Sequence, residues 1–188
     1  EDMAGYEKTL GRVRDCLDVR QEVLEIGCGT GTTALHLAPF TKHLLATDFS
    51  AEMIAIAREK LAAQPVPQLS FALVDADALP FEEGAFDTVL AFSVLHLVND
   101  LDAAVAQVAR LLRPGGLFIS KTPCVSEMNP IIPWIALPLM RAVGKAPHVL
   151  CFTGESLAAA VVRQGLELVS VERHASRGKD VRAFIVAR

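Results

Sequence analysis

Residues 23–31 have the sequence VLEIGCGTG, in which apolar residues surround Glu25 and a glycine then stands at every second position. The first half is typical of a buried β-strand. The second half predicts a turn without side-chain bulk, where the backbone approaches a ligand closely. Residues 32–38 have helical character, and a strand, a glycine turn and a helix in this order predict a nucleotide-type cofactor pocket. The alternative is that the glycines serve only a tight turn.

The rest of the chain repeats the alternation of strand and helix. An amphipathic helix is expected at 6–18, and strands are expected at 22–26, 43–48, 69–74, 86–92 and 117–120, with helices after most of them. The runs 166–172 and 182–187 alternate in polarity and predict an antiparallel hairpin. We therefore expect an α/β fold, with a doubly wound, seven-stranded Rossmann-like sheet. The sheet is mostly parallel with its last strand antiparallel, and helices cover both faces.

Composition limits the classes of function. The 188 residues suit a single domain, in which residues 122–152, with five prolines and the only tryptophan, form an inserted cap. The net charge of −4, without a Lys/Arg-dense run, disfavours nucleic acid as a partner. The four cysteines form no CxxC pair, so neither a metal site nor a disulfide framework is expected, and free thiols favour a cytoplasmic location. The longest apolar run, 130–140, is too short for stable membrane insertion.

Three further positions, each at or just after the end of an expected strand, support a cofactor site beside the glycine turn. Asp48 ends the second expected strand, where a carboxylate accepts two hydrogen bonds from a ribose diol. Asp75 follows the third strand, on the outer side of the second, where it can accept from an exocyclic amine; the alternative is a solvated loop carboxylate. Phe92 and Ser93 come at the end of the fourth strand, across the switch point from the first.

The spacing of the glycines indicates which cofactor is bound. Gly27, Gly29 and Gly31 form GxGxG, whereas dinucleotide folds use GxGxxG to bring helix-terminal amides to a pyrophosphate. Here the branched Thr32 takes the position of the last glycine of that motif. Glu25 places a carboxylate beside the turn, which would repel a pyrophosphate and favour a cofactor with a cationic amine or sulfonium.

Five motifs now resemble, in order, those of class I S-adenosylmethionine-dependent methyltransferases. The nearest group is that of ubiquinone/menaquinone-biosynthesis and related small-molecule methyltransferases. The motifs are VLEIGCGTG at 23–31, ATDFS at 46–50, VDADALPF at 74–81, FDTV at 86–89 and LLRPGG at 111–116. Together they cover roughly residues 20–121, and the combination is far more specific than any one of them.

The resemblance implies a role for each matching residue, with S-adenosylmethionine as the cofactor. Gly27, Cys28 and Gly29 line the methionine moiety and ribose, Glu25 lies near the methionine amine, and Asp48 holds the ribose hydroxyls. Phe49 and Met53 pack on the adenine, Asp75 and Ala76 contact its edge, and Phe92 and Ser93 lie beside the methionine part. In many relatives an N-terminal helix, here near Tyr6, closes over the carboxylate end.

The expected reaction is in-line methyl transfer to a small, apolar or aromatic acceptor. A general base is needed only if the nucleophile must lose a proton, and His96 is the candidate; the alternative is a histidine that merely packs. Cys28 is interpreted as a small apolar filler. The segment 122–152 is expected to wall the acceptor pocket, or else to pack on the sheet edge or form a homodimer surface. The competing functions are an NAD-binding Rossmann oxidoreductase and a non-catalytic S-adenosylmethionine-binding scaffold.

Overall fold

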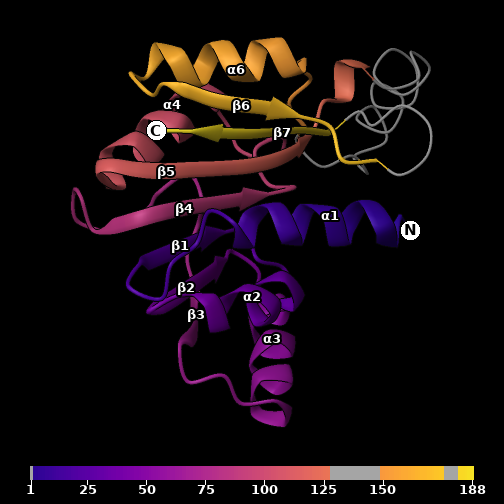
Figure 1. Cartoon of the computed structure of the whole chain (residues 1–188), viewed down its shortest axis with the longest axis vertical. Helices are drawn as coiled ribbons and strands as arrows, with labels where there is room; N and C mark the ends of the chain where they lie inside the picture. Colours follow the sequence, from indigo (N-terminus) through magenta and orange to yellow (C-terminus); the bar gives the residue numbers. More distant parts are fainter. Residues whose placement is uncertain (1, 128–148, 176–181) are drawn as a thin grey trace.

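The computed structural model describes residues 2–127, 149–175 and 182–188, and a seven-stranded sheet forms the centre of this part of the chain. The strands lie in the order β3-β2-β1-β4-β5-β7-β6 (Figure 1). Their bounds are β1 Glu22–Ile26, β2 His43–Asp48, β3 Leu69–Leu73, β4 Phe86–Phe92, β5 Leu112–Pro123, β6 Leu168–Glu172 and β7 Arg182–Ala187. The helices are α1 Met3–Arg14, α2 Thr32–Leu37, α3 Ala51–Ala63, α4 Leu101–Leu111 and α6 Gly154–Arg163, with short 3₁₀ turns at Ala38–Phe40 and Val125–Glu127.

The predicted fold class is confirmed by the strand pairing. β1 pairs in parallel with β2 and β4, β2 with β3, and β4 with β5, whereas β7 is antiparallel to both β5 and β6. The strand order therefore reverses between β1 and β4, which makes their carboxyl ends the topological switch point where α/β folds bind ligands. Since Ile26 pairs with Thr47 and with Ala91, the glycine turn emerges beside the ends of β2 and β4.

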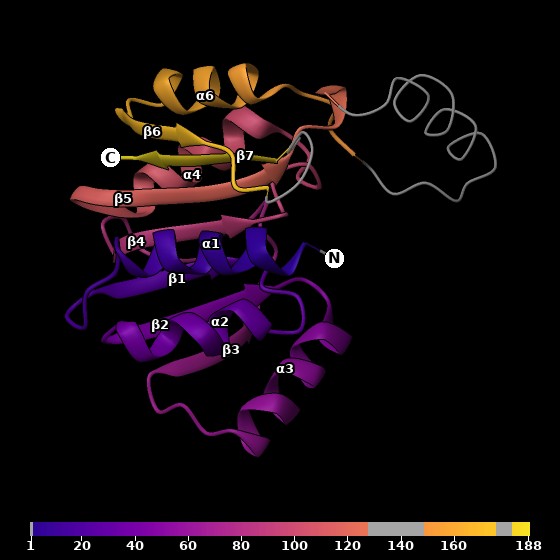
Figure 2. The same ribbon diagram turned by 45° about the vertical axis from the view of Figure 1, so that its right-hand side comes forward.

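Helices cover both faces of the sheet, and each face has its own apolar core. On one face α1, α2 and α3 bury residues such as Leu10, Leu37 and Ile54 against Leu44 and Leu90 of the strands. On the other face α4 and α6 bury side chains against the opposite set of strand residues. Figure 2 shows α1 lying along β1 and β4, which places the N-terminal helix next to the switch point.

The helix boundaries follow their capping residues. Ser50 caps α3 by accepting a hydrogen bond from the Met53 amide (3.3 Å), and serine is among the residues preferred at this position. The first helix was expected at 6–18 but begins at Met3 and ends at Arg14. Its earlier start comes from Asp2, which accepts a hydrogen bond from the Gly5 amide (2.9 Å), a cap too close to the first residue to stand out in the sequence.

The fifth strand is longer than predicted. Residues 117–120 were expected, but β5 runs from Leu112 to Pro123, because Leu112 already pairs with Phe86 and the register shifts before Leu117. The last two residues of the strand, which were assigned to the inserted cap, pair with β7. Most of the predicted cap, 128–148, lies outside the described residues, as do residues 176–181 between the two runs of the predicted hairpin. No helix within 2–127, 149–175 and 182–188 has both the length and the apolar character needed to cross a membrane.

Candidate functional site

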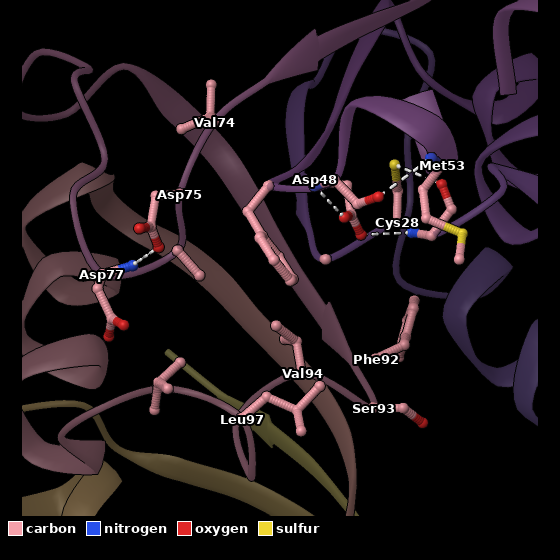
Figure 3. Close-up of a pocket in the computed structure, with 16 residues that line it drawn as sticks. Cys28, Asp48, Met53, Val74, Asp75, Asp77, Phe92, Ser93, Val94 and Leu97 are labelled. Atoms are coloured by element: carbon pink, nitrogen blue, oxygen red, sulfur yellow. Dashed lines mark hydrogen bonds between the residues drawn. The ribbon is translucent and has the colours of Figure 1, made fainter. Parts of the chain in front are cut away.

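A cavity of about 500 Å³ opens at the carboxyl ends of β1, β2, β3 and β4 (Figure 3). We call it the first cavity. All but one of the residues predicted to bind the cofactor line this cavity. They are Gly27, Cys28, Gly29, Asp48, Phe49, Met53, Asp75, Ala76, Phe92 and Ser93. Further walls come from residues to which the sequence assigned no binding role: Ser50, Val74 and Asp77, which lie within the quoted motifs, and Val94, Leu97 and Val98, which do not. The missing residue, Glu25, lines an adjoining cavity.

The glycine turn forms the floor of the first cavity in a conformation that requires glycine. Gly27, Gly29 and Gly31 all have positive φ, at 69°, 54° and 72°. The turn is fixed to the sheet by a hydrogen bond from the Cys28 amide to the Thr47 carbonyl oxygen (2.8 Å). Below it, a Cβ added at Gly27 would lie 2.5 Å from Val94 Cγ2, so this glycine also permits close packing against the residues after β4.

Asp48 connects two of the elements that build the site. One carboxylate oxygen accepts a hydrogen bond from the Gly29 amide (2.9 Å), and the other accepts one from the Ser50 amide (2.9 Å). The side chain is only 8% exposed but still lines the first cavity. Because each carboxylate oxygen has two acceptor positions, Asp48 can hold the turn and bind hydroxyl groups in the cavity at the same time.

The acidic loop after β3 frames the opposite wall. Asp75 accepts a hydrogen bond from the Asp77 amide (2.9 Å), and Asp77 in turn accepts one from the side-chain amide of Asn99 (2.6 Å). In Figure 3 Asp75 and Asp77 face Val94 and Leu97 across the cavity. The pair Asp77–Asn99 thus holds the loop after β3 to the loop after β4, a contact over 22 residues that the sequence pattern did not reveal.

The two apolar side chains that were predicted to pack on the adenine are both exposed at the cavity. Phe49 is 74% exposed and Met53 39% exposed, although large apolar residues are normally covered. Both follow β2, next to Asp48. An aromatic ring and a thioether held in this way suit a flat apolar ligand face, such as a purine, better than a charged group.

A second cavity, of about 270 Å³, adjoins the first beneath α1. The two cavities share Gly27, Cys28, Phe92 and Ser93. Glu25 of β1 and Lys121 of β5 contribute charged side chains, and α1 contributes Tyr6, Thr9, Leu10 and Val13. The Tyr6 hydroxyl is 3.1 Å from Thr33 Oγ1, so α1 and α2 are joined at the side of this cavity.

Glu25 is a buried carboxyl group without a full set of partners. It is 1% exposed, and its Oε2 has no hydrogen-bond partner among the described residues. Burial, together with the nearby charge of Asp48, raises the pKa of Glu25 to about 8. An uncompensated buried acceptor is costly to the fold, so a cationic ligand group that reached it would supply the missing partner.

The thiol of Cys28 is kept neutral by its surroundings. Burial, with the charges of Glu25 and Asp48, raises its pKa far above the usual range, and its Sγ lies 3.6 Å from the Gly29 carbonyl oxygen. Because the thiolate is the nucleophilic form, this environment supports the interpretation of Cys28 as a small filler in the turn.

The end of β4 contributes a strained backbone and the predicted base. Ser93 is the one non-glycine residue in the described ranges with positive φ (53°), and it lines both cavities. His96 follows three residues later but lines neither cavity. Burial lowers the pKa of its imidazole, and its Nδ1 has no partner in the described part of the chain. The role of His96 as a base stays a prediction.

Lys60 supports the glycine turn from outside and was missed by sequence reasoning. Its Nζ donates hydrogen bonds to Thr30 Oγ1 (2.8 Å) and Thr32 Oγ1 (2.9 Å), which connects α3 to the turn before α2. A lysine at the end of an amphipathic helix is normally solvated, so only the packing of α3 beside the turn reveals this contact.

Comparisons with known proteins agree with this geometry. The model of a family described as "Methyltransferase domain" matches residues 24–120, which is more than half of the chain. The chain is 36% identical over 118 residues to the demethylmenaquinone methyltransferase of Leptospira interrogans, covering 61% of this chain and 47% of that protein. It is 31% identical over 157 residues to that of Beutenbergia cavernae, covering 76% and 61%. The chain thus spans about half to three-fifths of the length of these relatives.

Among solved structures, the fold is similar to that of an S-adenosylmethionine-dependent methyltransferase from Mesorhizobium loti. The TM-score is 0.76 at 20% identity, covering 98% of each chain. At this level of identity the likeness concerns the fold alone. Because it covers nearly the whole chain, the fold is shared beyond residues 24–120 and includes α1, α6 and the final hairpin.

Proposed function

The chain belongs to the methyltransferase domain family, and we propose that it transfers a methyl group from S-adenosylmethionine to a small, apolar or aromatic acceptor by in-line displacement. The resemblance drawn from the motifs is thereby confirmed, and S-adenosylmethionine is the cofactor of this family. The observation that carries the proposal is the pair of adjoining cavities, with Asp48 in the first and the partly unpartnered carboxyl of Glu25 in the second.

The residues present fit this cofactor. Asp48 would hold the ribose hydroxyls, Phe49 and Met53 would cover the adenine, and Glu25 would bind the amino group of the methionine end. When bound, S-adenosylmethionine supplies a methyl group already activated by its positively charged sulfur. The chain then has to orient the two reactants in line and exclude water, and the wall of Phe92 and Ser93, which both cavities share, supports this proposal.

The acceptor is proposed to enter through the second cavity. Leu10, Val13 and Phe92 give that cavity apolar walls beside its charged residues. The relatives named demethylmenaquinone methyltransferases support a small-molecule acceptor. The wall or homodimer surface proposed for 122–152 lies mostly outside the described residues.

Replacing Asp48 by Ala is expected to weaken binding of S-adenosylhomocysteine by about 1–3 kcal/mol, roughly 5- to 150-fold, because charge-assisted hydrogen bonds to the ribose are lost. Titration calorimetry measures the affinity. Wild-type protein should also prefer adenosine to 2′,3′-dideoxyadenosine, and Asp48→Ala should erase that preference. Asp102→Ala, which removes an exposed carboxylate paired with Arg163 on α6, is the matched control. Unchanged affinity in Asp48→Ala would refute the ribose role.

Turnover separates the proposed activity from its alternatives. The purified protein is mixed with S-adenosylmethionine and a panel of small phenols, amines and quinols, and release of S-adenosylhomocysteine is measured. Acceptor-dependent release supports the enzyme. Tight binding of S-adenosylmethionine without release across the panel favours the non-catalytic scaffold, and binding of NAD in its place would overturn the proposal.

A further inference from the structure

The turn after β3 carries Asp75 and Ala76, the two residues predicted to contact the edge of the adenine. The Ala78 amide donates a hydrogen bond to the Asp75 carbonyl oxygen (3.1 Å), which closes a turn over residues 75–78. The Asp77 amide donates to one carboxylate oxygen of Asp75 (2.9 Å), as the dashed line in Figure 3 shows. This bond orients the Asp75 side chain, and the second carboxylate oxygen remains able to accept from a ligand.

Gln107 of α4 holds the end of this turn through hydrogen bonds to the main chain. Its side-chain oxygen accepts a hydrogen bond from the Leu79 amide (3.0 Å), and its side-chain nitrogen donates one to the Asp77 carbonyl oxygen (3.0 Å). One planar amide therefore satisfies a donor and an acceptor of the main chain that lie two residues apart. Because Leu79 is only 5% exposed, water is poorly placed to take over these bonds if Gln107 is removed.

Two other side chains from the region of α4 contact the same loop, but at different groups. The Asn99 side chain donates a hydrogen bond to the Asp77 carboxylate (2.6 Å), and Arg110 donates one to the Phe81 carbonyl oxygen (2.9 Å), which lies beyond the turn. Of these three side chains, Gln107 is therefore the one that binds the main chain of the turn itself.

The start of the turn is fixed separately by β2. The Val74 amide donates a hydrogen bond to the Asp48 carbonyl oxygen (3.0 Å), so the chain enters the turn beside the residue proposed to hold the ribose. The turn is thus anchored at both ends, at β2 and at Gln107. Loss of the second anchor would let Asp75 and Ala76 shift relative to Asp48, and a displacement of about 1 Å is enough to weaken a directional contact.

We propose that Gln107 is a positioning residue for the base of the cofactor: by holding the 75–78 turn in place, it makes the site select adenine over bases without a 6-amino group. The proposal rests on the cofactor binding proposed above. Gln107 lines neither cavity, so it acts on the ligand only through the turn that it holds.

The chemistry of the bases makes this selection depend on the position of the turn. Adenine presents an exocyclic amine, which can donate to the Asp75 carboxylate, next to N1, which can accept from the Ala76 amide. Hypoxanthine presents a carbonyl oxygen and an N1–H group at the same two places, so both contacts become repulsive. A turn held in place cannot adapt to this reversal, whereas a released turn can move away from it.

The test compares two ligands that differ only in the base. S-adenosylhomocysteine and S-inosylhomocysteine are titrated into the protein by calorimetry, and wild type should bind the first more tightly by about tenfold or more. Gln107→Leu keeps a similar volume but has no hydrogen-bonding group, and it should lower this preference to roughly threefold or less. Gln164→Leu is the matched control and should keep the wild-type preference, because Gln164, at the end of α6, contacts the Asp102 side chain (3.4 Å) instead of the turn.

A second ratio separates positioning of the base from general damage to the site. The preference for adenosine over 2′,3′-dideoxyadenosine depends on the ribose and Asp48, so it should be the same in Gln107→Leu as in wild type. Two results overturn the proposal: a base preference in Gln107→Leu equal to that of wild type, or a parallel loss of the base and ribose preferences.

Should Gln107→Leu fail to fold, hydrogen exchange of the Leu79 amide in wild type still decides, because this amide donates to Gln107. The two ligands are compared at the same ratio of concentration to dissociation constant. S-adenosylhomocysteine should slow the exchange more than S-inosylhomocysteine does, since only adenine loses favourable contacts when the turn opens. Equal protection by both ligands would contradict the proposal.

Failure of this proposal is distinguishable from failure of the proposed function. If wild type binds neither ligand, the proposed function itself is wrong. If wild type binds both ligands with equal affinity, the cofactor site stands, but the base is not recognised at the 75–78 turn and the role of Gln107 is wrong.

Discussion

Replacing Gly27 by Ala is expected to lower the free energy of unfolding by about 2–5 kcal/mol and to abolish measurable binding of S-adenosylhomocysteine. The φ of 69° costs an L-residue roughly 1–2 kcal/mol. The new Cβ would also lie 2.5 Å from Val94 Cγ2 and 2.6 Å from Val94 Cβ, and relief of such overpacking costs about 1–3 kcal/mol more. Because Val94 lines the first cavity, the displacement reaches the ligand site.

Gly29→Ala is the matched control for this substitution. Gly29 has a similar φ of 54°, but a Cβ there meets no atom within 4 Å, so only the backbone cost of roughly 1–2 kcal/mol is expected. Urea denaturation measures both variants, and the double variant Gly27→Ala/Val94→Ala should recover part of the stability that Gly27→Ala loses. Equal stability of the two glycine variants would show that the contact with Val94 does not matter.

This contrast also shows how far the sequence could predict the molecule. The order of strands, the glycine turn and the cap at Ser50 are local patterns, and the structure agrees with them. The difference between Gly27 and Gly29 depends on Val94, which is distant in the chain and reaches the turn only because β4 pairs with β1. Residues of identical type and similar φ thus differ in a way that no local pattern contains.

Charged residues were the least predictable part of the site. The sequence alone predicts a charged Glu25 that repels a pyrophosphate, whereas burial leaves much of it protonated at neutral pH in the absence of a ligand. The sequence does not indicate that Lys121 is buried, because a lysine in a strand is normally on the solvated side. Its burial follows from α1 packing across β5, a contact between residues 9 and 121.

The protonation of Glu25 predicts a strong pH dependence of cofactor binding. The pKa of Glu25 is about 8 in the folded protein, which exceeds the value near 4.5 expected in the unfolded chain. The protonated side chain therefore contributes stability that is fully present below about pH 4.5 and is lost as pH rises through about 8.

Binding of the cationic amino group of the ligand requires the ionised form of Glu25 and releases a proton. Affinity for S-adenosylhomocysteine should therefore rise up to tenfold per pH unit, roughly 100-fold from about pH 5.5 to about pH 7.5.

Glu25→Gln and a truncated ligand isolate this effect. The glutamine has no proton to release, so its affinity for S-adenosylhomocysteine should be lower near neutral pH and flat over the same range. 5′-Methylthioadenosine lacks the amino-acid group and should bind wild type without pH dependence, which separates Glu25 from other titrating groups. Calorimetry in buffers of different ionisation enthalpy should count up to one proton released by wild type and none by Glu25→Gln. Since the amino group has to reach a carboxyl that is 1% exposed, a flat profile in wild type would mean that the methionine end does not enter the second cavity.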